Sequence, residues 1–189
     1  MNLDNIKNTL PEVKIIETLH EIIIKAEYKD ILNIINTLKQ NKETQASCFI
    51  GIFGVHNPNS KNEFCLEYLF LSMKYNMRFR IIINFDANNE IDSISETFKG
   101  AIWYEREAFD MFGIKFKNLH DPRRLLTDYG FKHHPLRKDF PLTGHEEVRY
   151  DPISQEVKYS PTNLTQEYRD FDLQTPWNTD AVFEKIKNS

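Results

Sequence analysis

Residues 77–85 read MRFRIIINF, and this stretch alternates between two kinds of side chain. Every second residue from position 79 is large and apolar: Phe79, Ile81, Ile83 and Phe85. The positions between them include Arg78, Arg80 and Asn84. Because successive side chains of a strand point to opposite faces, this pattern predicts a β-strand with one buried and one solvated face.

The segments on either side extend this strand into a sheet. EFCLEYLFLSM (63–73) predicts a second strand, and HEIIIKAE (20–27) a third. SCFIGIFGV (47–55) is apolar on both faces, which predicts a central strand covered on both sides. Together these segments favour a β-meander.

Two helices are expected before and within this set of strands. Residues 3–17 predict a short helix. DILNIINTLKQ (30–40) places four apolar residues on one helical face, with Asp30 as candidate N-cap: Ile31, Ile34, Ile35 and Leu38. The fold class is therefore α+β, with helices packed on a mostly antiparallel sheet in a domain of residues 1–115.

SISETFKGAIWYEREAFDMFG (93–113) predicts another helix. Ser93 and Glu96 match a capping box, and Gly100 is expected to break or bend the helix. The main part then runs over residues 101–112, with Gly113 suited to the position after the helix end.

Glu105 lies within the apolar stripe of this helix, between Ile102 and Phe109. A buried ionised carboxylate must be paired, hydrogen-bonded or protonated. A structural ion pair with Arg123 or Arg124 is the favoured interpretation, and a proton-handling acid is the alternative. On the flank of the stripe, Arg106 and Asp110 have the spacing of an ion pair, and Glu107 is expected to point to the opposite side.

Regular periodicity ends near residue 115. Prolines recur to the end of the chain and exclude long helices and central strands. Eight aromatic residues nevertheless occur between positions 125 and 177, beside Leu125 and Leu126. We therefore predict that residues 116–189 form a long extended tail that buries its aromatic side chains against its own domain or a partner.

Composition excludes several classes of protein. A formal net charge of −4 gives no general attraction to nucleic acid or anionic lipid, and no apolar run has the length of a membrane span. The N-terminal residues show no secretory or transit-peptide pattern. Cys48 and Cys65 are expected to be core residues, and two cysteines cannot supply the four thiolates of an iron–sulfur cluster.

The stretch DYGFKHHPLRKDFPL (128–142) leaves three functions open. Histidines in this region, with Asp121 and Asp139, could bind a metal, although their spacing matches no known metal-site pattern. Basic residues interleaved with aromatics resemble a single-strand nucleic-acid site, but the positive patch is small. A protein interface is favoured, because arginines and aromatics are the usual buried anchors there.

Three segments together resemble the 30 kDa subunit family of respiratory complex I, the proton-pumping NADH–quinone oxidoreductase. They are EREAFDMFGIKF (105–116), RRLLTDYGFKHHPLRKDFPLTGHEEVRYD (123–151) and TQEYRDFDLQTPW (165–177). The family is known as the C subunit in bacteria and as subunit 9 when mitochondrially encoded. Residues 119–122 depart from it, because Leu-His-Asp-Pro stands where the family usually has His-Pro-Asp-Leu.

The resemblance implies a non-redox core subunit of the peripheral arm, with a structural or assembly role. Its expected partners are the 49 kDa quinone-site subunit and neighbouring iron–sulfur subunits, and FMN and the clusters are expected in partners. Membrane association is expected only through partners, on the matrix side of the mitochondrial inner membrane or the cytoplasmic face of a bacterial one. An equivalent subunit of a membrane-bound hydrogenase is the alternative. The predicted structural and interface residues are Glu105, Arg106, Glu107, Asp110, Arg123, Arg124, His134, Arg137, Lys138 and Phe140.

Overall fold

The computed structural model describes residues 13–166 and residue 169, and the chain forms two compact units. The first unit spans Met1–Leu142 and the second Thr143–Ser189. The division into a domain up to residue 115 and a tail that wraps partners stays a prediction.

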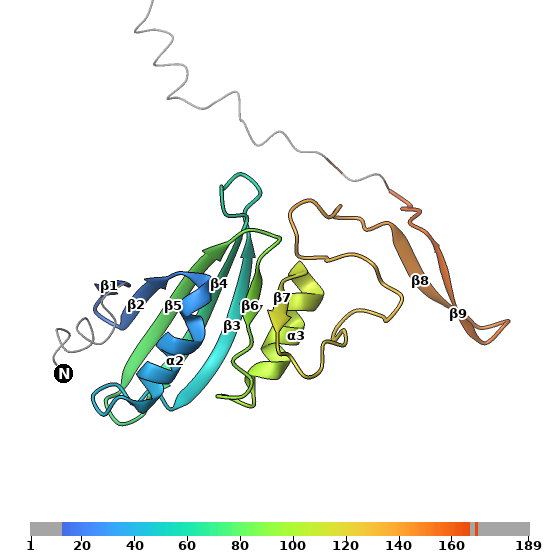
Figure 1. Ribbon diagram of the computed structural model, residues 1–189. Helices are drawn as coiled ribbons and strands as arrows, with labels where there is room; N and C mark the ends of the chain where they lie inside the picture. Colours follow the sequence, from blue (N-terminus) through green and yellow to red (C-terminus); the bar gives the residue numbers. More distant parts are fainter. Residues whose placement is uncertain (1–12, 167–168, 170–189) are drawn as a thin grey trace, which may run out of the picture. The chain divides into compact units, whose positions relative to one another are not determined.

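A five-stranded sheet with the order β1-β2-β5-β4-β3 forms the centre of the first unit (Figure 1). Its strands are β1 (Lys14–Glu17), β2 (Glu21–Ala26), β3 (Cys48–His56), β4 (Phe64–Ser72) and β5 (Met77–Phe85). The neighbours β3, β4 and β5 form the predicted antiparallel meander, and β2 runs parallel to β5. Two short strands, β6 (Glu90–Asp92) and β7 (Lys115–Lys117), pair separately in parallel.

Helix α2 (Ile31–Gln40) covers one face of the sheet, and helix α3 (Ala101–Phe112) packs against β3. The apolar face predicted for α2 is confirmed, because its four apolar residues are all buried. Asp30 occupies the N-cap position but makes no capping bond through its side chain. A short 3-10 turn, η1 (Tyr28–Asp30), precedes the helix. The α+β fold class is confirmed.

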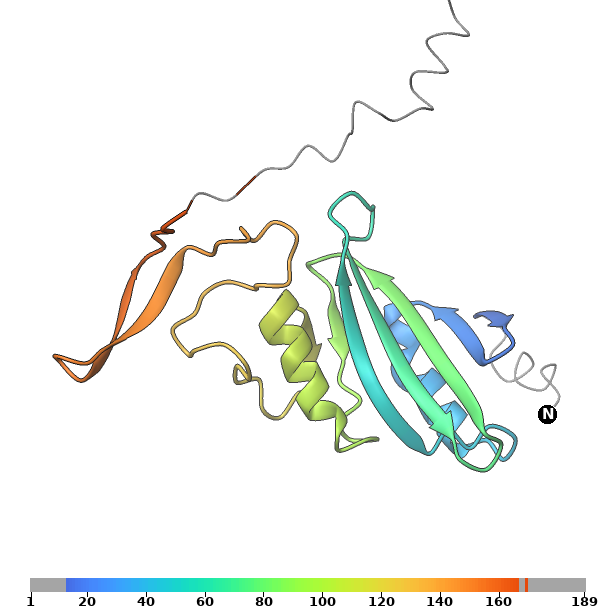
Figure 2. The same ribbon diagram turned by 180° about the vertical axis from the view of Figure 1, so that it is seen from behind.

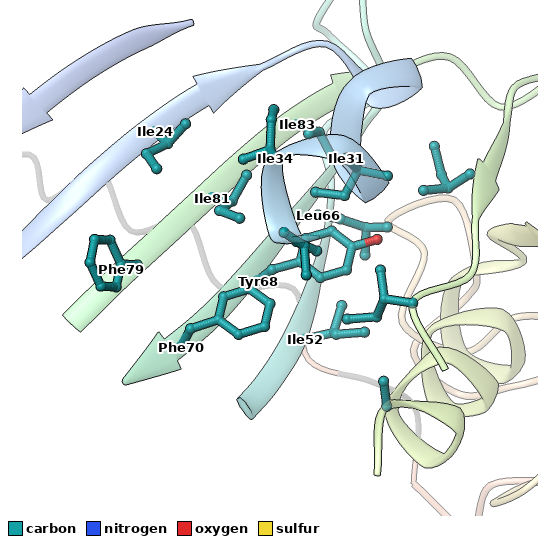
Figure 3. Packing of buried hydrophobic residues seen from close by; sticks show 14 of the residues in the cluster. Ile24, Ile31, Ile34, Ile52, Leu66, Tyr68, Phe70, Phe79, Ile81 and Ile83 are labelled. Carbon is teal, nitrogen blue, oxygen red and sulfur yellow. The ribbon is translucent and has the colours of Figure 1, made fainter. Parts of the chain in front are cut away.

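The core lies between α2 and the sheet (Figure 3). Phe79, Ile81 and Ile83 of β5 are fully buried, as the alternation of this strand predicted. In Figure 3 these side chains lie on the face of the sheet that Ile31 and Ile34 of α2 cover. Burying an apolar side chain of this size contributes about 1.5–3 kcal/mol, so this layer is the main source of stability.

Strand β3 lies at the edge of the sheet, so the prediction of a central strand was wrong. Its inward residues are apolar because they face the core and α3: the Phe49 ring lies 5.3 Å from that of Tyr104 in α3. Its outward residues Phe53 and Val55 are about half exposed, with 52% and 46% of their surface accessible. An edge strand can thus be apolar on both faces without being covered on both.

Two helical predictions were also wrong. Residues 14–17, predicted as the end of a helix, form β1 and pair with β2, and the rest of that prediction falls on residues 3–12, outside the described residues. Residues 93–100 form turns, and helix α3 starts at Ala101. Ser93 does not cap a helix, because its hydroxyl donates to the Glu105 carboxylate at 2.6 Å.

The second unit contains an antiparallel hairpin of β8 (Glu146–Asp151) and β9 (Glu156–Pro161). One face carries ion pairs, Arg149 with Glu147 and Lys158 with Asp151. The other face carries two cross-strand pairs of apolar residues, all more than half exposed: Val148 with Tyr159 and Tyr150 with Val157. The hairpin is therefore amphipathic.

Candidate interaction site around helix α3

The end of helix α3 requires a glycine. Gly113 has a φ of 76° and donates its N–H to the Phe109 carbonyl at 2.8 Å, which confirms its predicted position. A side chain is also excluded by space: a Cβ atom would lie 2.7 Å from His134 Nε2 and 2.9 Å from Arg137 Nη2. Two residues of the aperiodic segment thus lie directly against the helix end.

Asp110 is the centre of the contacts between α3 and that segment. Its side chain is fully buried, and Oδ2 accepts the backbone N–H groups of Leu125, Leu126 and Thr127 at 3.0, 2.7 and 2.9 Å. Oδ1 accepts from Arg124 Nη1 at 2.7 Å and from the Thr127 hydroxyl at 2.5 Å. Burial by itself would raise the pKa of Asp110, but these hydrogen bonds hold it well below its usual range.

Arg106 fixes the preceding residues of the segment. Its Nε donates to the Arg123 carbonyl at 2.9 Å and its Nη2 to the Arg124 carbonyl at 3.1 Å. Its Nη1 lies 3.4 Å from Asp121 Oδ2. The predicted pair of Arg106 with Asp110 is therefore wrong, since each side chain instead binds the segment after the helix.

The last carbonyl groups of α3 are also satisfied by this segment. Asp110 O lies 2.9 Å from His134 Nδ1, and Met111 O accepts the Leu136 N–H at 3.1 Å. Phe112 O accepts from Arg137 Nε at 2.6 Å. Because terminal helix carbonyls have no partner within the helix and carry partial negative charge, these donors both cap and stabilise it.

Glu105 is fully buried and hydrogen-bonded rather than paired with an arginine. Its Oε2 accepts from the Ser93 hydroxyl at 2.6 Å and its Oε1 from the Ile94 N–H at 2.7 Å. The favoured prediction of an ion pair was wrong, because Arg124 binds Asp110 and Arg123 binds Asp121. Burial raises the pKa of Glu105, and the bonds from Ser93 and Ile94 only partly offset it.

The remaining predicted residues lie at the surface of this site. The Glu107 and Lys138 side chains are exposed, in agreement with the predicted direction of Glu107, and the Lys138 N–H donates to His56 Nδ1 at 2.9 Å. The Phe140 ring lies 5.8 Å from that of His133. Burial lowers the pKa of His134.

Sequence reasoning missed several residues that complete the site. Thr127 supplies two of the five donors to Asp110, and His56 binds the segment from β3. Asp121, considered only as a metal ligand, binds the Arg123 guanidinium through both its oxygens at 2.8 and 2.7 Å. Short polar residues at such separations carry no periodic signal, so only the turn-forming character of Asp and Thr was available to indicate them.

Within residues 13–166 and at residue 169, neither helix has the length and apolar character that a membrane crossing requires. Over the same residues, no three His, Cys, Asp or Glu side chains lie close enough together to hold a metal ion.

The solved structures include a chain with a similar fold. It belongs to the membrane-bound sulfane sulfur reductase, an archaeal respiratory membrane complex. The match has a TM-score of 0.63 and covers 74% of this chain and 84% of that chain. At 19% sequence identity the likeness shows a shared fold.

The sequence comparisons are more specific. A family model described as respiratory-chain NADH dehydrogenase, 30 Kd subunit, matches residues 24–146. The NADH-quinone oxidoreductase C subunit of Chelativorans sp. (strain BNC1) is 45% identical over 171 residues, which cover 88% of this chain and 86% of that protein. The same subunit of Hyphomonas neptunium is 45% identical over 157 residues, covering 83% and 78%. The chain therefore belongs to the 30 kDa subunit family of respiratory-chain NADH dehydrogenase, which includes the C subunits of NADH-quinone oxidoreductase.

Proposed function

We propose that this chain is a non-redox scaffold subunit in the peripheral arm of a proton-pumping NADH:ubiquinone oxidoreductase. In this role it packs beside the 49 kDa quinone-site subunit and neighbouring iron–sulfur subunits. Electron transfer from NADH to ubiquinone is then a property of the assembly. Membership of the 30 kDa subunit family supports the assembly, and the surface of residues 121–142 supports the scaffold role.

The observation that carries this proposal is a group of exposed apolar side chains in that segment. Three of its polar side chains bind the chain itself: Arg124, Thr127 and Arg137. Several of its large apolar side chains are exposed: Leu126 is 63% exposed, Tyr129 80% and Leu142 77%. Exposed apolar residues gathered in one segment are typical of an interface.

The β8–β9 hairpin adds a second surface of the same kind. An isolated two-stranded hairpin is marginally stable in water, and its Val148, Tyr150 and Val157 side chains are more than half exposed. Burying this face against a partner would stabilise the hairpin and the complex together. Whether Arg137, Lys138 and Phe140 also contact partners stays a prediction.

The cofactors of the reaction are assigned to other subunits. The chain has two cysteines, Cys48 and Cys65, whereas iron–sulfur clusters are usually held by four. We place FMN and the iron–sulfur clusters in partner subunits. The same partners hold the chain at the surface of a respiratory membrane. The two relatives described above come from bacteria, which supports the cytoplasmic face of a bacterial membrane over the mitochondrial matrix.

Co-purification of the tagged full chain tests the proposal. The chain is expected to migrate on a native gel in a very large band that oxidises NADH with a quinone acceptor. A Tyr129→Asp variant should fold normally yet be depleted from that band by about tenfold, since a central interface residue contributes more than 1 kcal/mol. Met73→Asp is the control, because Met73 is 70% exposed in the turn between β4 and β5.

Two outcomes would contradict the proposal. One is a wild-type chain that migrates alone in membranes with active enzyme. The other is stoichiometric iron or flavin in the purified chain. Migration in a large complex without NADH:quinone activity, but with hydrogenase activity, would favour the related hydrogenase instead.

A further inference from the structure

The face of the sheet opposite α2 is not covered by either helix. Figure 2 shows this face toward the viewer, with α2 behind the sheet. The residues that alternate with the core positions point to this face. Ile23 of β2, Arg80 of β5 and Leu69 of β4 are examples, and they are neighbours across the three strands. We call this surface the outer face.

One half of the outer face, over β1, β2 and β5, is cationic. Arg80 lies 3.1 Å from Glu21 and 3.4 Å from Glu67, so one arginine is the ion-pair partner of both carboxylates. Three exposed cations surround this group: Lys14, Lys25 and Arg78. Within the part of the chain that the structure describes, no carboxylate forms an ion pair with any of these three. The face thus presents positive charge, although the chain is negative overall.

The other half, over β3 and β4, is apolar except for Glu67 of β4, which pairs with Arg80. Phe53 and Val55 are 52% and 46% exposed, and Leu69 and Leu71 beside them are partly exposed. Burial raises the pKa of the Cys65 thiol, which faces Val55, to about 11. A solvated sheet face normally alternates with polar residues at such positions, so this half has the composition of a covered surface.

We propose that the outer face binds an amphipathic helix of another subunit, with its apolar side on β3 and β4 and an acidic flank over Lys14, Lys25 and Arg78. A helix packed through its apolar side is one of the common ways to cover the face of a sheet. The charge pattern argues against the other occupants. A second copy that docked through its own outer face would bring like charge to the cationic half, and a nucleic acid would leave the apolar half uncovered.

This surface is formed by other residues than 121–142, on which the proposed function rests and which reach β3 through the inward-facing His56. The inference rests on the proposed function in one respect, namely that other subunits are present in the complex. The chain would then contact two partner surfaces, one through the segment around α3 and one through the outer face.

Site-specific photo-cross-linking in the assembled complex tests this inference. A photoreactive phenylalanine analogue at Phe53 should cross-link to one other subunit, within a peptide of helical apolar spacing that carries several carboxylates. The same analogue at Met73, in the turn between β4 and β5, should not cross-link to that peptide. A cross-link from position 53 to this chain, to a second copy or to nothing would overturn the inference.

A charge reversal provides the second measurement. The double change Lys14→Glu with Lys25→Glu should lower recovery of the chain in the complex about tenfold and leave its melting temperature unchanged, because both side chains are exposed. Lys61→Glu, in the loop between β3 and β4, is the control. If the wild-type chain enters the complex and the double variant does so equally, only this inference fails. If the wild type itself stays outside, the proposed function fails.

Discussion

Two regions of the first unit are held in place by different kinds of interaction. The sheet and α2 are joined by apolar burial, with Phe79, Ile81 and Ile31 at 0% exposure. Residues 121–137 are joined to α3 mainly by hydrogen bonds and ion pairs centred on Asp110 and Arg106. Apolar burial contributes the larger free energy but tolerates small shifts, whereas a set of directed polar contacts defines one position.

The largest expected effect lies in the apolar region. Phe79→Ala should lower the free energy of unfolding by about 3–5 kcal/mol, because it removes a fully buried ring and leaves a cavity. Met73→Ala, at an exposed position, should change it by no more than about 0.5 kcal/mol. Denaturant unfolding of the full chain measures both, and equal effects would contradict the account of the core.

In the polar region, Asp110→Asn should lower the free energy of unfolding by about 2–4 kcal/mol. The change leaves Arg124 without its carboxylate and places an amide donor among backbone N–H groups. The loss should be local, so limited proteolysis should cut within residues 121–137 before the sheet unfolds. Asp86→Asn, at an exposed aspartate, is the control and should leave the cleavage pattern unchanged.

The Asp110 carboxylate also predicts how the free energy of unfolding depends on pH. Its folded pKa lies below the unfolded one, so its contribution is fully present above about pH 4 and is lost as the pH falls toward the folded pKa. Acid titration of unfolding should therefore show a steeper loss in the wild type than in Asp110→Asn. Parallel curves would be evidence against the hydrogen-bonded carboxylate.

Glu105, on the same helix, predicts a pH dependence of stability in the opposite direction. Its pKa is raised, so its contribution is fully present below the unfolded pKa of about 4.3 and is lost as the pH rises through the folded pKa. Glu105→Gln should therefore gain stability over the wild type toward neutral pH. Glu105→Ala should lose about 1–3 kcal/mol, because the donors of Ser93 and Ile94 lose their acceptor. A Gln variant less stable than wild type at pH 7 would contradict the buried charge.

The smallest expected effect concerns Thr127. Thr127→Val removes the hydroxyl bond to Asp110 and should lower the free energy of unfolding by about 1 kcal/mol. Thr127→Ser keeps the hydroxyl and should retain most of that free energy. Unfolding measurements on the pair separate the hydroxyl from the methyl group. If both variants lose the same free energy, the hydroxyl bond does not contribute.

The two regions also differ in how far the sequence predicts them. Alternation located β4 and β5, a helical stripe located α2, and Gly113 located the end of α3. The edge position of β3 could not be predicted, since apolar residues on both faces fit a central strand equally well. The donors to Asp110 were not predictable because they lie 14–17 residues further along the chain without any period.

Hydrogen exchange on the full chain alone tests the central claim that the segment after α3 is bound to the helix before any partner is present. The informative amides are those of Leu125, Leu126, Thr127 and Leu136, whose acceptors are Asp110 and the Met111 carbonyl. The account predicts that they exchange slowly in the wild type and rapidly in Asp110→Asn, while amides of β5 stay protected in both. Rapid exchange of these four amides in the wild-type chain would contradict it.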